Sequence, residues 1–127
     1  MVSVVNPNTM NIHRPRALQI RLKQIPSMDV FFTVPPGFGI DEVAWVETAG
    51  NTVNGGLDIG TTDGGNDVVA AFPIAGGSMG LFGQGTTNQI LKCVFSLSVP
   101  QILYVHAHTG WNNAVLNLYF GFMKLNP

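Results

Sequence analysis

The sequence predicts an all-β protein, an antiparallel, jelly-roll-like β-sandwich of about eight strands. Short runs in which apolar and polar residues alternate recur along the chain, and turn residues separate them. The 15 glycines and 8 prolines supply such turns, and a hydrophobic content of 46% suffices for a packed core. No long window shows the apolar period and the caps of a helix, so we expect little helix. A compact immunoglobulin-like sandwich is the alternative topology.

The first two strands are expected at residues 17–25 and 29–34. The first alternates apolar with polar side chains, namely Leu18, Ile20 and Leu22 against Gln19, Arg21 and Lys23. This period of two places one face of a strand in the core. The second run is rich in β-branched and aromatic residues, and Pro35-Pro36-Gly37 closes it because proline cannot continue a ladder.

The next two strands are expected at residues 43–48, which contain Trp45, and at residues 56–61. Ala49-Gly50-Asn51 offers a turn between them, and Asp63-Gly64-Gly65-Asn66 offers another after the second. Glycine, asparagine and aspartate suit tight turns because they accept a positive φ angle.

Residues 68–74, 89–97, 102–108 and 114–125 are the last four expected strands. The glycine-rich residues 75–88 separate the first two of them, and we expect a long loop or a short irregular strand there. The final strand alternates four apolar residues, Leu116, Leu118, Phe120 and Phe122, with Asn117, Tyr119, Gly121 and Met123.

The chain of 127 residues has the length of one domain. We expect residues 17–127 to form a single β-sandwich domain and residues 1–16 to form an N-terminal arm that lies on a neighbouring subunit. The first residues lack the order of a secretory signal, and no apolar run is long enough for a membrane span. Cys93 is the only cysteine, so an intramolecular disulfide is impossible, and its apolar surroundings predict a buried core residue.

Charged residues are few and are sorted along the chain. They make up 10% of the residues, and residues 68–127 contain only Lys92 and Lys124. A charge-poor exterior is typical of an obligate interface with other protein. Four basic residues, Arg14, Arg16, Arg21 and Lys23, precede all seven acids, which lie between Asp29 and Asp67. This order either creates separate basic and acidic patches or is neutralised where strands from the two segments pair.

His106 and His108 stand two apart in an expected strand, so their imidazoles project from one face about 7 Å apart, a spacing that suits two metal ligands. A cupin-like metal enzyme would place an acid shortly after this pair, but Asn112 and Asn113 stand there. We therefore keep the pair only as a weak metal candidate and expect no cofactor. The alternative is that both histidines line an interface or the solvent face beside Tyr104.

Other motifs argue against an enzyme and against nucleic acid. No nucleophile motif is present, and the glycine-rich string GLFGQGTT lacks the lysine of a phosphate loop. Asp58, Asp63 and Asp67 do not have the spacing of an EF-hand and are expected to shape turns. A sequence pI near 6.2 disfavours a large phosphate footprint. Glycan binding stays open, because the chain has four aromatic residues that can stack on sugars, Trp45, Tyr104, Trp111 and Tyr119.

Residues 55–74, GGLDIGTTDGGNDVVAAFPI, resemble a stretch that recurs in small capsid-associated and tail-adjacent proteins of tailed bacteriophages. In that family a pattern GG-L-x-IGTT-x-GG-x-DVV-A precedes a glycine-rich link and a closing pair of strands, which residues 104–125 resemble. The likeness covers about half of the chain and consists mainly of strand and turn residues.

The resemblance implies a non-enzymatic virion component made in the host cytoplasm and placed on the capsid surface. It is similar to jelly-roll decoration or cement proteins, which would make the major capsid protein and a second or third copy of the chain its partners, with no nucleic acid and no membrane. The alternative is the head domain of a fibre or spike that binds host-surface glycans. The expected interface residues are Arg14, Arg16, Met79, Leu81, Phe82, Trp111, Asn112 and Asn113.

Overall fold

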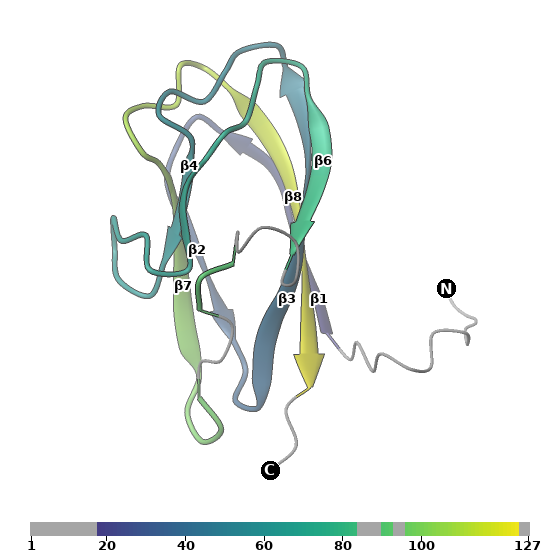
Figure 1. Ribbon diagram of the computed structural model, residues 1–127, viewed down its shortest axis with the longest axis vertical. Coiled ribbons are helices and arrows are strands. Elements are labelled where there is room, and N and C mark those ends of the chain that lie inside the picture. Colours follow the sequence, from purple (N-terminus) through teal and green to yellow (C-terminus); the bar gives the residue numbers. More distant parts are fainter. Residues whose placement is uncertain (1–17, 84–89, 93–95, 125–127) are drawn as a thin grey trace, which may run out of the picture.

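The computed structural model describes residues 18–83, 90–92 and 96–124 (Figure 1). These residues form eight strands and no helix, which confirms the all-β class. The strands are β1 (Leu18–Pro26), β2 (Val30–Val34), β3 (Phe38–Ala49), β4 (Leu57–Gly60), β5 (Val69–Phe72), β6 (Met79–Gly83), β7 (Gln101–Ala107) and β8 (Val115–Lys124). The expected arm at residues 1–16, which includes Arg14 and Arg16, lies outside the described residues, as does Cys93.

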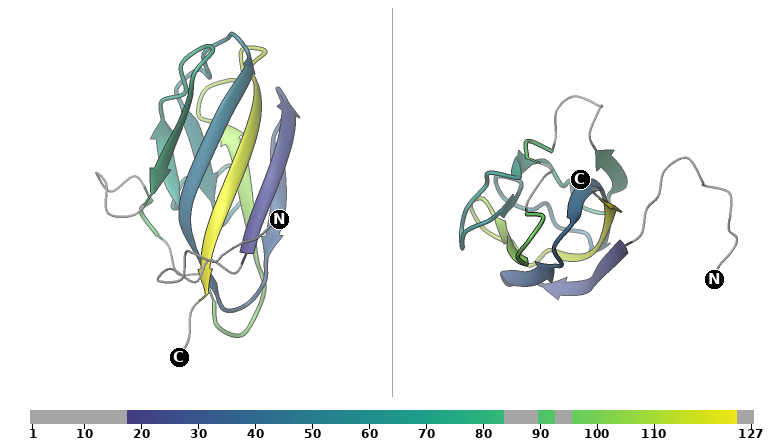
Figure 2. Two further views of the ribbon diagram at one scale, coloured as in Figure 1. Left: turned by 90° about the vertical axis from the view of Figure 1, so that its right-hand side faces the viewer. Right: turned by 90° about the horizontal axis from the view of Figure 1, so that it is seen from below.

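The strands form two antiparallel sheets that pack face to face as a β-sandwich (Figure 2). One sheet has the order β1-β8-β3-β6, and the other has the order β2-β7-β4-β5. The pairing is nested, because β1 pairs with β8, β2 with β7, β3 with β6 and β4 with β5. The chain is therefore arranged like one long hairpin folded across two sheets, with its first and last strands side by side.

The strand directions divide the loops between two ends of the sandwich (Figure 1). Residues 50–56, 73–78 and 108–114 connect strands at what we call the upper end, which lies at the top of Figure 1. Residues 35–37 and 96–100 lie at the opposite, lower end. The two ends can therefore meet different partners.

The core lies between the sheets and uses the inward side chains of the alternating positions. Leu116, Leu118, Phe120 and Phe122 of β8 are all buried, as their alternation predicted. Phe32 of the other sheet contacts Phe120 and Phe122, with ring centroids 4.7 and 6.4 Å apart. These contacts join the two sheets across the middle of the sandwich, where each buried aromatic ring contributes a large apolar area.

One expected strand is wrong, and a strand forms in the glycine-rich segment instead. Residues 90–92, 96 and 97, the described part of the expected strand at 89–97, lie in no strand. β6 forms within residues 75–88 and pairs with β3. A β-carbon on Gly80 would lie 2.5 Å from the ring of Trp45. Glycine is thus what allows β6 to lie under this ring, although glycine in the sequence argued against a strand.

Candidate functional site

Strand β6 exposes two of the expected interface residues and buries the third. Met79 and Leu81 are 72% and 62% exposed, so a partner can reach them. Phe82 is buried, and its ring lies 6.0 Å from that of Trp45 and 4.1 Å from that of Phe72. The expectation that Phe82 contacts a partner is therefore corrected, because the alternation along β6 directs its side chain into the core.

Trp111, Asn112 and Asn113 form the turn before β8, and contacts within the chain hold them. Asn112 and Asn113 have φ angles of 53° and 58°, and the Ala114 N–H donates to the Trp111 carbonyl at 2.8 Å. Asparagine tolerates this left-handed conformation, which explains the Asn-Asn pair. The Trp111 indole N–H donates to Asp29 Oδ1 at 2.8 Å while the ring packs against the core. The two asparagines are exposed, and Trp111 is partly buried.

His106 and His108 meet at the buried carboxylate of Asp58. Asp58 of β4 faces His106 of β7, and all three side chains lie on the outer face of the sheet. Asp58 Oδ2 lies 2.9 Å from His108 Nδ1 in a hydrogen bond, and Asp58 Oδ1 accepts the Ala71 N–H at 2.6 Å. His106 Nε2 lies 3.1 Å from the same Oδ2 but makes no hydrogen bond. The cluster joins β4, β5 and β7.

The backbone at Ala71 explains why a carboxylate is buried at this place. Ala71 has a φ angle of 49°, which residues other than glycine rarely adopt. β5 carries one extra residue here, because the register moves from Leu57↔Phe72 to Ile59↔Val69. Asp58 accepts the N–H of this bulge. Sequence reasoning missed this role of Asp58, and the available signal was an aspartate in the middle of the apolar strand β4.

A metal site at the histidine pair finds no geometric support. Among the residues that the structure describes, no group of three or more His, Cys, Asp or Glu is arranged to hold a metal ion. The hydrogen bond between His108 Nδ1 and Asp58 Oδ2 instead joins this imidazole to the carboxylate. About half of the His108 side chain is exposed, so a partner can reach this imidazole.

Asp67 shapes the loop between β4 and β5, as expected for a turn residue. Its Oδ1 accepts the Thr61 N–H at 2.7 Å, and its Oδ2 accepts the Thr61 hydroxyl at 2.6 Å. Partial burial raises the pKa of Asp67, but these hydrogen bonds and the charge of Lys92, 3.6 Å away, outweigh burial and lower the pKa. Both carboxylate oxygens thus accept hydrogen bonds from within the loop.

The basic and acidic segments do not meet as paired strands. Arg21 and Lys23 are exposed on β1, which pairs with β8 alone among the described strands. Tyr119 faces Arg21 across this pair. The exposed acids Asp63 and Asp67 lie in the loop after β4, in the other sheet. Asp63 and Asp67 thus follow a strand of the other sheet, whereas Glu42 of β3 lines a surface pocket together with Arg21.

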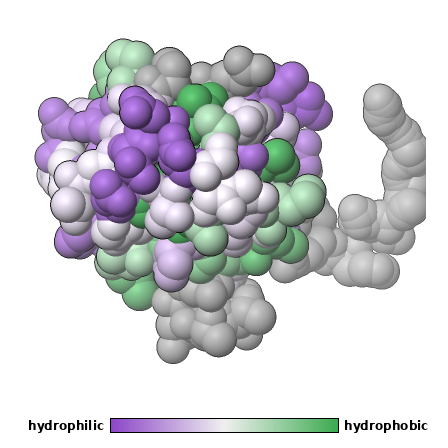
Figure 3. All heavy atoms as spheres, turned by 90° about the horizontal axis from the view of Figure 1, so that it is seen from above, coloured by the Kyte–Doolittle hydropathy of each residue, from purple (hydrophilic) through white to green (hydrophobic). Residues whose placement is uncertain are grey.

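The two loops at the lower end, residues 35–37 and 96–100, contain no charged residue. They meet where the Gly37 N–H donates to the Ser96 carbonyl at 2.9 Å. The exposed apolar residues of these loops are Pro35, Pro36, Leu97, Val99 and Pro100, which we call the lower-end patch. Phe31 and Ile102 are exposed on the adjoining outer face of the β2-β7 pair. Much of the upper end, in contrast, is hydrophilic (Figure 3).

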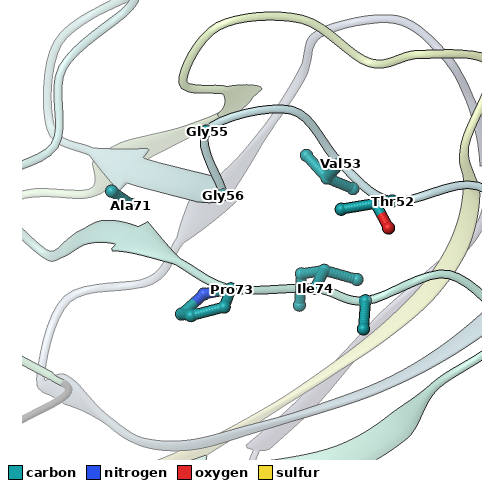
Figure 4. Close-up of a pocket in the computed structure, with 8 residues that line it drawn as sticks. Thr52, Val53, Gly55, Gly56, Ala71, Pro73 and Ile74 are labelled. Atoms are coloured by element: carbon teal, nitrogen blue, oxygen red, sulfur yellow. The ribbon is translucent and has the colours of Figure 1, made fainter.

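A cavity of about 350 Å³ opens at the upper end between residues 52–56 and 71–75 (Figure 4). Its lining residues are Thr52, Val53, Gly55, Gly56, Ala71, Pro73, Ile74 and Ala75. The walls are apolar side chains and glycine backbone, and no titratable side chain lines them. The cavity can accept a small apolar group but supplies no acid, base or nucleophile.

No family model matches the chain, and no curated protein or solved structure matches it either. The described residues include no helix with the length and apolar character that crossing a membrane requires.

Proposed function

We propose that the protein is a structural, non-enzymatic component of a bacteriophage virion, a decoration or cement protein that binds the lattice of the major capsid protein. The strand orders β1-β8-β3-β6 and β2-β7-β4-β5 support a jelly roll, since they consist of nested pairs of one folded hairpin. Jelly rolls are frequent among viral capsid and lectin domains. The likeness of residues 55–74 to capsid-associated phage proteins points the same way.

The observation that carries the proposal is the lower-end patch. It gathers exposed leucine, valine and proline side chains on two loops without any charge. Interface cores are depleted of charged residues, and contiguous exposed apolar surface marks interaction sites. Phe31 and Ile102 extend the apolar surface along the β2-β7 face, which enlarges the area that a capsid protein can cover.

Stabilisation of the shell follows from mass action. A protein that binds a surface present only in the assembled lattice shifts the equilibrium towards that lattice. No catalytic group is needed for this effect, because the buried contact area alone supplies the free energy.

The first test is the copy number of this chain relative to the major capsid protein in purified particles, measured by calibrated mass spectrometry. A decoration protein is expected in a simple ratio to the capsid protein. A few copies per particle, or none, would contradict the proposal and make a glycan screen the next experiment.

A second test asks whether the lower-end patch is the contact. Leu97→Asn is expected to reduce occupancy on particles, because it places an amide in the apolar contact. Leu91→Asn is the matched control, since Leu91 is 57% exposed and Leu97 is 55% exposed. Leu91 lies elsewhere, where its N–H donates to the Val68 carbonyl. Equal occupancy of the two variants would contradict the assignment.

The alternative of a glycan-binding head domain draws less support. That reading needs exposed aromatic platforms, but Trp111 is partly buried and its N–H already donates to Asp29. Tyr104 is also partly buried beside Phe31, with ring centroids 5.9 Å apart.

A further inference from the structure

The four edge strands of the sandwich differ in their protection against pairing with another chain. Proteins protect such edges with charges, prolines, bulges or short strands. β1 carries Arg21 and Lys23, β2 runs into Pro35-Pro36, and β5 is four residues long and contains the bulge at Ala71. β6, with the sequence MGLFG, has no charge, no proline and no register shift against β3.

Met79 and Leu81 present their backbone to the free side of β6. The Glu47 N–H donates to the Ser78 carbonyl at 2.9 Å, in continuation of the β3-β6 ladder. Hydrogen-bonded positions alternate along an antiparallel ladder, so the backbone of Gly80 also bonds towards β3. Met79 and Leu81 therefore direct their N–H and C=O groups away from β3, and no described strand pairs on that side.

We propose that β6 pairs with β6 of a second copy of this chain, antiparallel about a two-fold axis at Gly80. In this register Met79 of each copy faces Leu81 of the other, and each of these two pairs exchanges two hydrogen bonds. The N–H and C=O groups of Met79 and Leu81 are then satisfied in both copies. Gly80 faces its counterpart at the position where antiparallel strands come closest, and the contact joins two four-stranded sheets into one.

The chemistry of β6 favours a second copy as the occupant. A two-fold contact places a strand against itself, so charges on it would face like charges, and β6 has none. Met79 and Leu81 of both copies form one apolar patch on the outer face, flanked by Ala44 and Val46 of β3. The inference does not depend on binding to a capsid, because it concerns a different surface from the lower-end patch.

Sedimentation equilibrium of the full chain over a concentration series tests the dimer. Two short strands bury less than the roughly 1,200 Å² of a stable interface, so the expected association is weak and rises with concentration. The double variant Met79→Lys/Leu81→Lys is expected to raise the dimer Kd by roughly tenfold or more, since like charges then face each other. Leu91→Lys, at a similarly exposed leucine outside β6, should leave the Kd unchanged.

A second variant, with glutamates in place of the lysines, makes the test specific to this register. A mixture of the lysine variant with Met79→Glu/Leu81→Glu is expected to associate as a heterodimer, because opposite charges face each other in both pairs. Hydrogen exchange of the unmodified chain adds a second readout, in which the Met79 and Leu81 amides exchange more slowly as concentration rises while the Gly80 amide does not change. A chain that stays monomeric, a Kd insensitive to the lysines, or outward amides with concentration-independent exchange would overturn the proposal.

Discussion

Ala71 shows how one residue determines the local geometry of the β2-β7-β4-β5 sheet. It adopts a left-handed conformation with a φ of 49°, and its N–H donates to Asp58 at 2.6 Å. Ala71→Gly is expected to raise the free energy of unfolding by about 0.5–1 kcal/mol, because relief of the left-handed penalty exceeds the added chain entropy of glycine. Urea denaturation measures the change.

Ala70→Gly is the control for this substitution. Ala70 is the exposed neighbour of Ala71 and is absent from the positive-φ positions of the described chain. The control is expected to lose roughly 0.5–1 kcal/mol, the ordinary effect of glycine in a strand. A loss of similar size in Ala71→Gly would show that its conformation carries no strain.

Sequence reasoning recognised the histidine pair but missed the group that binds it. Period-two spacing placed His106 and His108 on one face, and the structure confirms that arrangement. Their common neighbour Asp58 lies about 50 residues earlier, and only the pairing of β4 with β7 brings it there. The spacing of residues within one strand therefore predicted orientation, while contacts between strands depended on the fold.

At the scale of an element, the loop between β4 and β5 depends on ionised Asp67. The pKa of Asp67 is lowered in the folded chain, so Asp67 stabilises the fold above the ordinary range of an aspartate. This contribution is lost as pH falls through the lowered pKa. It is small, because the side chain is exposed and solvent screens its charge.

Thr61→Val tests the cause of this pKa. The substitution removes the hydroxyl that donates to Asp67 Oδ2 at 2.6 Å, so the pKa of Asp67 is expected to rise towards the ordinary value of about 3.9. An NMR titration of the Asp67 carboxyl measures it, with Thr62→Val as the neighbouring control. If both variants titrate like the unmodified chain, the Thr61 hydroxyl does not lower the pKa.

For the whole molecule, one core between two sheets predicts one cooperative unfolding transition. Phe120→Ala is expected to lower the free energy of unfolding by about 3–5 kcal/mol, because it leaves a cavity against Phe32. Trp45 and Trp111 lie on different elements, so the single-tryptophan variants Trp111→Phe and Trp45→Phe report separately on each. Within each variant, the midpoint from tryptophan fluorescence should equal the midpoint from circular dichroism in urea. Different midpoints from the two methods in one variant would mean that parts of the sandwich unfold independently.

The sequence by itself determined the all-β class, most of the strands and the alternation of their buried residues. β7 and β8 show the reason, because a period of two is a property of each segment alone and holds whatever that segment pairs with. Local pattern also predicted the turn use of Asp67, since its side chain acts on nearby backbone.

Only the tertiary structure decided the order of the strands, the strand at β6 and the bulge held by Asp58. Glycine in the sequence argues against a strand at Gly80. Gly80 is nevertheless a strand residue, because the Trp45 ring occupies the space that a side chain at this position would need. Phe82 was expected at an interface and is buried, because the pairing of β6 with β3 determines which face of β6 turns towards the core. These outcomes depend on contacts between residues far apart in the chain, which no local pattern encodes.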